Sequence, residues 1–119
     1  MATKEVTNDN FRDVYTNNDI VILDFWAAWC GPCQNFKPVY EQVSEKYADV
    51  FFGTVETDAE QKLSAYFHIR SIPSIIIIRE GLEIFRNSGS LNELQLSEAI
   101  EQIKSLDMEA VKKEHDEAE

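Results

Sequence analysis

The fold and the chemistry of this chain are both indicated by residues 25–33, which read FWAAWCGPC. Cys30 and Cys33 in this stretch are the only two cysteines, and they lie three positions apart around a Gly-Pro pair. A disulfide that closes so small a ring makes a poor structural crosslink, because the stabilisation grows with the length of the closed loop. The spacing therefore indicates chemistry at the two sulfurs.

The residues on either side of the pair predict a strand followed by a helix. Ile20–Trp26 is apolar nearly throughout, which is typical of a buried strand. Beyond the cysteines, apolar residues recur at intervals of three and four, which predicts an amphipathic helix over Cys33–Ala48 that Pro38 should kink. We therefore expect Cys30 to lie at the N-terminus of a helix.

Patterns elsewhere in the chain predict an α/β fold. The expected elements are a short helix after the capping residues Thr7–Asn10, strands Val50–Val55 and Ile75–Ile78, a helix Ala59–Phe67 with Leu63, Tyr66 and Phe67 inward, a hairpin turn at Glu80-Gly81, an antiparallel strand Leu82–Arg86, and a final helix after a capping box Ser90–Glu93. This order implies a mixed sheet with helices on both faces.

Length and composition bound the protein further. The 119 residues fit one domain, which we place at residues 1–106, followed by an acidic C-terminal extension at 107–119 that is either helical or frayed. No apolar segment is long enough to cross a bilayer, and the first twenty residues lack a signal peptide core, so we expect a soluble, cytoplasmic protein. A net charge of -11 argues against nucleic acid as a partner.

The two cysteines are expected to differ in reactivity. At a helix N-terminus, the unpaired amides and the helix dipole lower the pKa of a thiol, so Cys30 is the expected nucleophile, exposed and ready to ionise. Cys33, one turn on and nearer the core, should stay a neutral thiol that resolves the mixed disulfide. This asymmetry is what thiol-disulfide exchange requires.

A metal site is the alternative for a Cys-x-x-Cys pair. Structural zinc needs four ligands, but the chain offers one cysteine pair and two histidines, His68 and His115, far apart in sequence. A haem attachment would need histidine where Gln34 stands. We therefore predict no metal site, and we interpret His68 as a surface or packing residue.

Asp24 interrupts the most apolar strand of the chain. A carboxylate buried without partners costs several kcal/mol or holds a proton near neutrality. Asp24 could instead point to a polar pocket or to solvent at a strand edge. Its place on the strand that leads to Cys30 favours a role as the proton acceptor for Cys33.

These residues resemble the thioredoxin family. The resemblance rests on Asp24 through Cys33, on Pro38, on Ile72-Pro73, and on Gly81 and Gly89, and it spans roughly Val6 to Leu106. It implies a thioredoxin fold, a five-stranded mixed sheet flanked by four helices. It also implies a monomeric enzyme without a bound cofactor, which reduces disulfides of target proteins and is recycled by thioredoxin reductase, an NADPH-linked flavoprotein.

The resemblance also assigns roles to residues. Cys30 would attack, Cys33 would resolve and Asp24 would carry the proton, while a target-docking surface would comprise Trp29, Gly31, Pro32, Ile72, Pro73 and Gly89, with Pro73 in a cis peptide bond. Several positions depart from the family pattern: Thr54 stands where a lysine often faces the buried aspartate, Gln34 where a cation is frequent, and Thr57 and Ser88 at usually aliphatic docking positions.

Two other functions fit the same pattern. The chain could be a thioredoxin-like adaptor or chaperone that binds through the Trp29 and Pro73 surface without redox turnover. It could also be a disulfide isomerase or oxidant, although Gly-Pro between the cysteines is more typical of reductases.

Overall fold

The computed structural model describes residues 2–118. Met1, the first residue of the predicted domain, and Glu119, the last residue of the predicted extension, lie outside the described residues. Five strands form one sheet in the order β1-β3-β2-β4-β5. Their bounds are β1 Thr3–Glu5, β2 Ile20–Trp26, β3 Phe51–Glu56, β4 Ser74–Arg79 and β5 Leu82–Ser88. β1, β3 and β2 run parallel, whereas β4 is antiparallel to both β2 and β5. The predicted mixed sheet is therefore confirmed.

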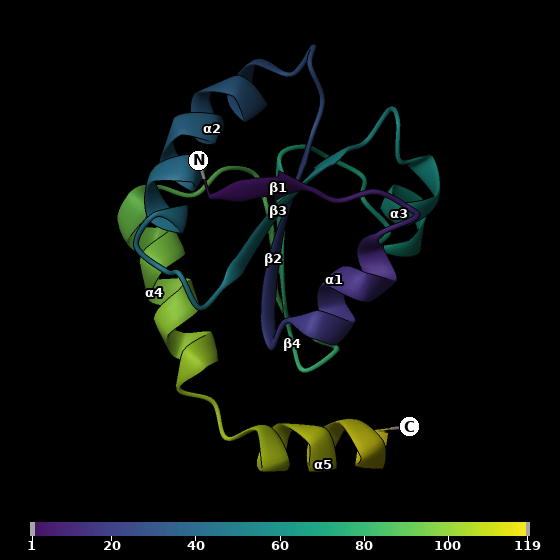
Figure 1. Ribbon diagram of the computed structural model, residues 1–119, viewed down its shortest axis with the longest axis vertical. Helices are drawn as coiled ribbons and strands as arrows, with labels where there is room; N and C mark the ends of the chain where they lie inside the picture. Colours follow the sequence, from purple (N-terminus) through teal and green to yellow (C-terminus); the bar gives the residue numbers. More distant parts are fainter. Residues whose placement is uncertain (1, 119) are drawn as a thin grey trace.

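Helices cover both faces of this sheet. Their bounds are α1 Phe11–Asn17, α2 Gly31–Ser44, α3 Gln61–Tyr66, α4 Glu93–Lys104 and α5 Met108–Ala118. Figure 1 shows α2 and α4 on one side of the sheet and α1 and α3 on the other. The four helices that the resemblance implies are present, and the C-terminal extension adds a fifth.

Side chains along β2 point alternately to the two faces of the sheet, which separates two parts of the core and decides which face Asp24 lies on. Ile20 and Ile22 pack in the core between the sheet and helices α2 and α4. Val21, Leu23 and Phe25 pack in the core on the side of α1 and α3. Since side chains of a strand point to opposite faces in turn, Asp24 lies on the α2 side, in line with the two isoleucines.

The helix after the cysteines differs in its bounds from the prediction. α2 begins at Gly31 rather than Cys33, because Cys30 itself is the capping residue, and it ends at Ser44 rather than Ala48. After Ser44 the amides of Lys46 and Tyr47 donate to carbonyls only three residues back, so the chain continues as a turn. Pro38 lies within the helix, as expected.

Two predictions about the other helices were wrong in detail. Helix α4 is capped by Asn92, whose side chain accepts a hydrogen bond from the Gln95 amide, rather than by Ser90. The capping pattern occurs in two registers two residues apart, and both matched the sequence. Tyr66 was expected to face inward but is 70% exposed, because Phe67 beside it takes the inward position at the end of this short helix.

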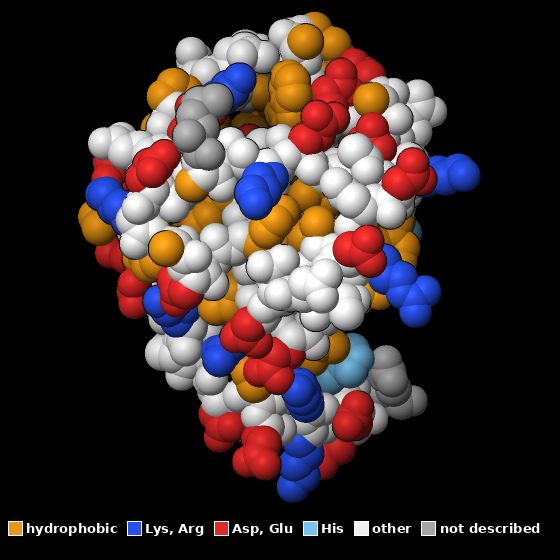
Figure 2. Space-filling model, viewed as in Figure 1, with side chains coloured by type: hydrophobic (Ala, Val, Ile, Leu, Met, Phe, Trp, Pro, Cys, Tyr) orange, Lys and Arg blue, Asp and Glu red, His pale blue; other side chains and the backbone are white. Residues whose placement is uncertain are grey.

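The hairpin and the C-terminal extension complete the fold. Glu80 and Gly81 both have positive φ, 51° and 82°, which suits a two-residue turn between antiparallel strands. The extension is helical rather than frayed: α5 packs through Met108, which is 8% exposed, and Lys112 pairs with Glu80. Figure 2 shows charged side chains of both signs at this end of the molecule. Within residues 2–118, no helix is both long and apolar enough to traverse a bilayer.

Candidate active site

The cysteine pair lies where strand β2 passes into helix α2. Cys30 caps the helix with extended backbone, and Cys33 lies in the first turn. The two residues form a disulfide with an S–S distance of 2.31 Å and a Cα–Cα distance of 5.3 Å. The backbone amide of Cys33 donates to the Cys30 Sγ at 3.2 Å. Once the ring opens, this amide and the positive end of the helix dipole would stabilise a thiolate on Cys30.

The exposure expected of Cys30 was wrong for this disulfide state. Cys30 is 5% exposed and Cys33 is 2% exposed, so both belong to the core of the molecule. The Cys30 Sγ lies 3.8 Å from the carbonyl oxygen of Ile72, and the ring packs against Ala27, Trp26 and Ile72. In contrast to the two sulfurs, Gly31 and Pro32 between the cysteines are exposed.

Asp24 is buried beneath helix α2 and lines a pocket with polar side chains, so it does not lie at a solvent-exposed strand edge. The residue is 3% exposed, and its Oδ1 has no hydrogen-bond partner within residues 2–118. Burial raises the pKa of Asp24 from 3.8 to about 7. A carboxyl group with such a pKa exchanges its proton near neutrality, which suits a proton acceptor for a thiol.

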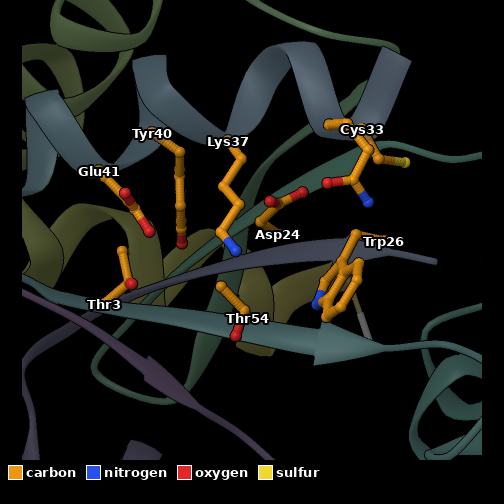
Figure 3. Close-up of a pocket in the computed structure, with 9 residues that line it drawn as sticks. Thr3, Asp24, Trp26, Cys33, Lys37, Tyr40, Glu41 and Thr54 are labelled. Atoms are coloured by element: carbon orange, nitrogen blue, oxygen red, sulfur yellow. The ribbon is translucent and has the colours of Figure 1, made fainter. Parts of the chain in front are cut away.

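A pocket of about 140 Å³ joins Asp24 to Cys33 (Figure 3). Thr54 of β3 is the register partner of Asp24 and lines the same pocket, so the predicted neighbour is confirmed. Tyr40 closes the pocket from α2, and its hydroxyl lies 2.7 Å from the Gly53 carbonyl oxygen and 3.1 Å from that of Ile22. Burial and the nearby Asp24 raise the pKa of Tyr40, which therefore stays neutral.

Two loops place the predicted docking residues around the disulfide. The Ile72–Pro73 peptide bond is cis, as the resemblance implies. Gly89 has a φ of 102°, a conformation that residues other than glycine rarely adopt. The backbone amide of Gly89 donates a hydrogen bond to the Pro73 carbonyl oxygen at 2.8 Å. Together with the contact between Cys30 and Ile72, this bond brings residues far apart in sequence to the rim of the disulfide.

Trp29 lies on the same rim and is 72% exposed. Its indole nitrogen donates to the Asp58 carboxylate at 2.9 Å, which holds the ring against the loop after β3. A groove of about 360 Å³ runs beside it, lined by Trp29, Thr57, Ser64, Ile69, Arg70, Ser71 and Ile72. Thr57 thus makes this groove more polar, whereas Ser88 pairs with Ser74 and does not line it.

Several residues of the site were not singled out from the sequence. Asp58 orients Trp29, but the contact joins positions 29 residues apart and leaves no local signal. Lys37, Tyr40 and Glu41 line the Asp24 pocket together with Cys33. Their spacing of four, seven and eight residues from Cys33 puts them on one face of a helix, and this periodicity could have found them.

The two histidines that could bind a metal ion lie apart from the cysteine pair in the part of the chain that the structure describes. Among the described residues, no group of three or more histidine, cysteine or acidic side chains could hold a metal ion. His68 follows helix α3 with a φ of 54° and lines a different pocket, beside Phe67 and Arg86.

Comparison with known proteins identifies relatives over nearly the whole chain. The thioredoxin family profile matches residues 2–102. A protein of Streptomyces coelicolor named "Putative thioredoxin 2" is 45% identical over 112 residues, which cover 94% of this chain and 84% of that protein. The thioredoxin of Haemophilus influenzae is 35% identical over 99 residues, which cover 82% of this chain and 92% of its own.

Solved structures agree with these relatives. Chloroplastic thioredoxin z superposes with a TM-score of 0.80 at 27% identity, over 89% of this chain and 97% of that chain. A point variant of the thioredoxin of Halobacterium salinarum also superposes with a TM-score of 0.80, at 30% identity over 87% of this chain and 92% of its own. With its disulfide pair at the head of α2, this chain belongs to the thioredoxin family and is a thiol-disulfide oxidoreductase.

Proposed function

We propose that this protein reduces disulfides of target proteins, with Cys30 as nucleophile, Cys33 as resolving thiol and Asp24 as proton acceptor. The observation that carries the assignment of roles is the position of Cys30 as the cap of α2, where its Sγ accepts the Cys33 amide. A thiolate at that position is stabilised by the helix end, whereas a thiolate on Cys33 would lie against the core.

The reaction proceeds in two displacements. The Cys30 thiolate attacks one sulfur of the target disulfide, forms a mixed disulfide, and releases the other target sulfur as a thiolate. The Cys33 thiol then gives its proton to the Asp24 carboxylate and attacks the Cys30 Sγ. This step closes the Cys30–Cys33 disulfide and releases the second target thiolate, so two electrons pass to the target.

Target chains dock on the rim around the disulfide. The exposed Trp29, the groove beside it and the hydrogen-bonded pair of Pro73 and Gly89 support this surface. Trp29, Gly31, Pro32, Ile72, Pro73 and Gly89 form its parts. Thr57 and Arg70 in the groove favour targets with polar or acidic residues beside the reacting cysteine.

Thioredoxin reductase then reduces the Cys30–Cys33 disulfide to the dithiol with two electrons from NADPH. The relatives named as thioredoxins support this partner. We further propose that the protein works as a monomer in the cytoplasm, away from membranes, where thiols are kept reduced.

A coupled assay tests these roles. The protein is incubated with NADPH, thioredoxin reductase from the same source and insulin, and NADPH oxidation is followed. Cys30→Ser should reduce turnover to the uncatalysed background. Cys33→Ser should also lose turnover but accumulate a mixed disulfide between Cys30 and the target, which mass spectrometry detects.

The outcomes separate this function from the adaptor and chaperone alternative. An adaptor would bind targets equally well with Cys30→Ser and would show no turnover in the native chain. Trapping of the target by Cys30→Ser rather than by Cys33→Ser would reverse the two cysteine roles.

A further inference from the structure

Asp24 is surrounded by neutral groups on every strand that packs against it. Its register partners are Thr54 on β3 and Ile75 on β4, neither of which carries a charge. The hydroxyl of Tyr40 has a single proton and lies within hydrogen-bond distance of two backbone carbonyl oxygens, so that proton is already engaged. Among the described residues, the Oδ1 of Asp24 has no hydrogen-bond partner.

Helix α2 brings the charged groups of this pocket. The pocket is lined by Thr3, Asp24, Trp26, Cys33, Gln34, Lys37, Tyr40, Glu41 and Thr54. Apart from Asp24, only Lys37 and Glu41 in this set carry a full charge, and they are one turn apart. Figure 3 shows the Lys37 amine directed into the pocket between Asp24 and Thr54, with the Glu41 carboxylate farther along the helix beyond Tyr40.

We propose that Lys37 and Glu41 are positioning residues that act on Asp24 in opposite senses, Lys37 favouring its carboxylate form and Glu41 its protonated form. A charge acts on the ionisation of a carboxyl group through space, so neither group needs to touch Asp24. Lys37 thereby supplies from helix α2 the positive charge that Thr54 does not supply from β3. The consequence for catalysis rests on the proposed role of Asp24 as proton acceptor.

Titration of the Asp24 carboxyl group by nuclear magnetic resonance, in the oxidised full-length protein, tests this inference. Lys37→Gln should raise the pKa of Asp24 by about half a unit or more, and Glu41→Gln should lower it by a similar amount. Lys62→Gln is the matched control, because it removes the same charge from the exposed surface of α3, across the sheet, and it should leave the titration unchanged. Thr54→Lys added to Lys37→Gln should restore a lower pKa.

Shifts of the same sign in the two single variants, or shifts no larger than the control, would overturn the inference. A variant that merely disturbed the packing of α2 would not produce opposite shifts and would not be rescued from β3. Circular dichroism melting of each variant confirms that the titrations compare folded proteins.

Turnover measured against pH separates this inference from the proposed function. If Asp24 accepts the proton of Cys33, the lower limb of the profile moves up in pH with Lys37→Gln and down with Glu41→Gln. Shifted titrations with an unmoved profile would overturn the role of Asp24 as proton acceptor. Unshifted titrations with normal turnover would overturn the charge pair and leave that role standing.

Discussion

At the scale of single residues, Asp24 makes the stability of the fold depend on pH. Burial raises its pKa from 3.8 to about 7, so between these values the folded chain holds a proton that the unfolded chain releases. Unfolding therefore becomes more favourable as the pH rises through this window. A rise of about three pKa units corresponds to a loss of about 4 kcal/mol once the pH exceeds 7.

Replacing Asp24 with a residue that cannot ionise should remove this loss. We expect Asp24→Asn to be more stable than the wild type at pH 8.5 by as much as about 4 kcal/mol, with the difference shrinking toward zero near pH 4. Urea unfolding of the oxidised proteins at several pH values measures it. Asp9→Asn, on the exposed surface before α1, is the control and should follow the wild type. A stability difference that did not change with pH would contradict the burial argument.

At the scale of elements, helix α4 shows how a start signal in the sequence can be read two residues early. Ser90-Leu91-Asn92-Glu93 and Asn92-Glu93-Leu94-Gln95 both match the capping pattern. The structure uses the second: the Asn92 side chain accepts the Gln95 amide at 2.8 Å, and the Gln95 side chain accepts the Asn92 amide at 3.0 Å. Leu96, Ala99, Ile100 and Ile103 then face the core.

Alanine substitutions distinguish the two registers. Asn92→Ala should destabilise the protein by about 1 kcal/mol, because the amide of Gln95 loses its acceptor. Ser90→Ala should change stability by less than about 0.5 kcal/mol, because this exposed side chain takes no part in the cap. Denaturant midpoints of the two variants are measured side by side. A loss no larger for Asn92→Ala than for Ser90→Ala would contradict the assignment of the cap to Asn92.

At the scale of the whole molecule, the C-terminal end of α4 is held by contacts that do not involve α5. Arg79 on β4 donates from Nη1 to the carbonyl oxygens of Ile103, Lys104 and Leu106, at 2.7, 3.2 and 3.2 Å. The last carbonyls of α4 are thus satisfied by the sheet rather than by the extension. In Figure 1, α5 lies at the opposite end of the long axis from the head of α2.

A chain ending at Leu106 should therefore fold and keep its turnover. It should lose about 1 to 2 kcal/mol of stability, because it no longer buries the side chain of Met108. The ion pair between Lys112 and Glu80 adds little to this loss, because Lys112 is exposed. Met108→Ala in the full chain should reproduce most of this loss. The insulin assay and thermal melting of both proteins provide the check. Loss of turnover in the truncated chain alone would assign a functional role to the extension.

The sequence was most informative where local pattern and burial agree. The apolar run of β2, the cysteines at the head of α2 and the β4–β5 hairpin were predicted because each depends on neighbours along the chain. β1 was not apparent from its own residues: Thr3–Glu5 has one half-buried and two exposed side chains, and only the family resemblance implied a fifth strand. It is a strand because it pairs in register with β3.

The sequence by itself determined that a reactive cysteine pair follows a buried strand and begins a helix, because these features are set by residues close together in the chain. Tertiary structure alone decided the burial of Asp24 beneath α2 and the contact between Trp29 and Asp58. Each depends on which side chains distant segments bring together. Charge and burial act through space, so the proton affinity of Asp24 follows from the packing of α2 over the sheet.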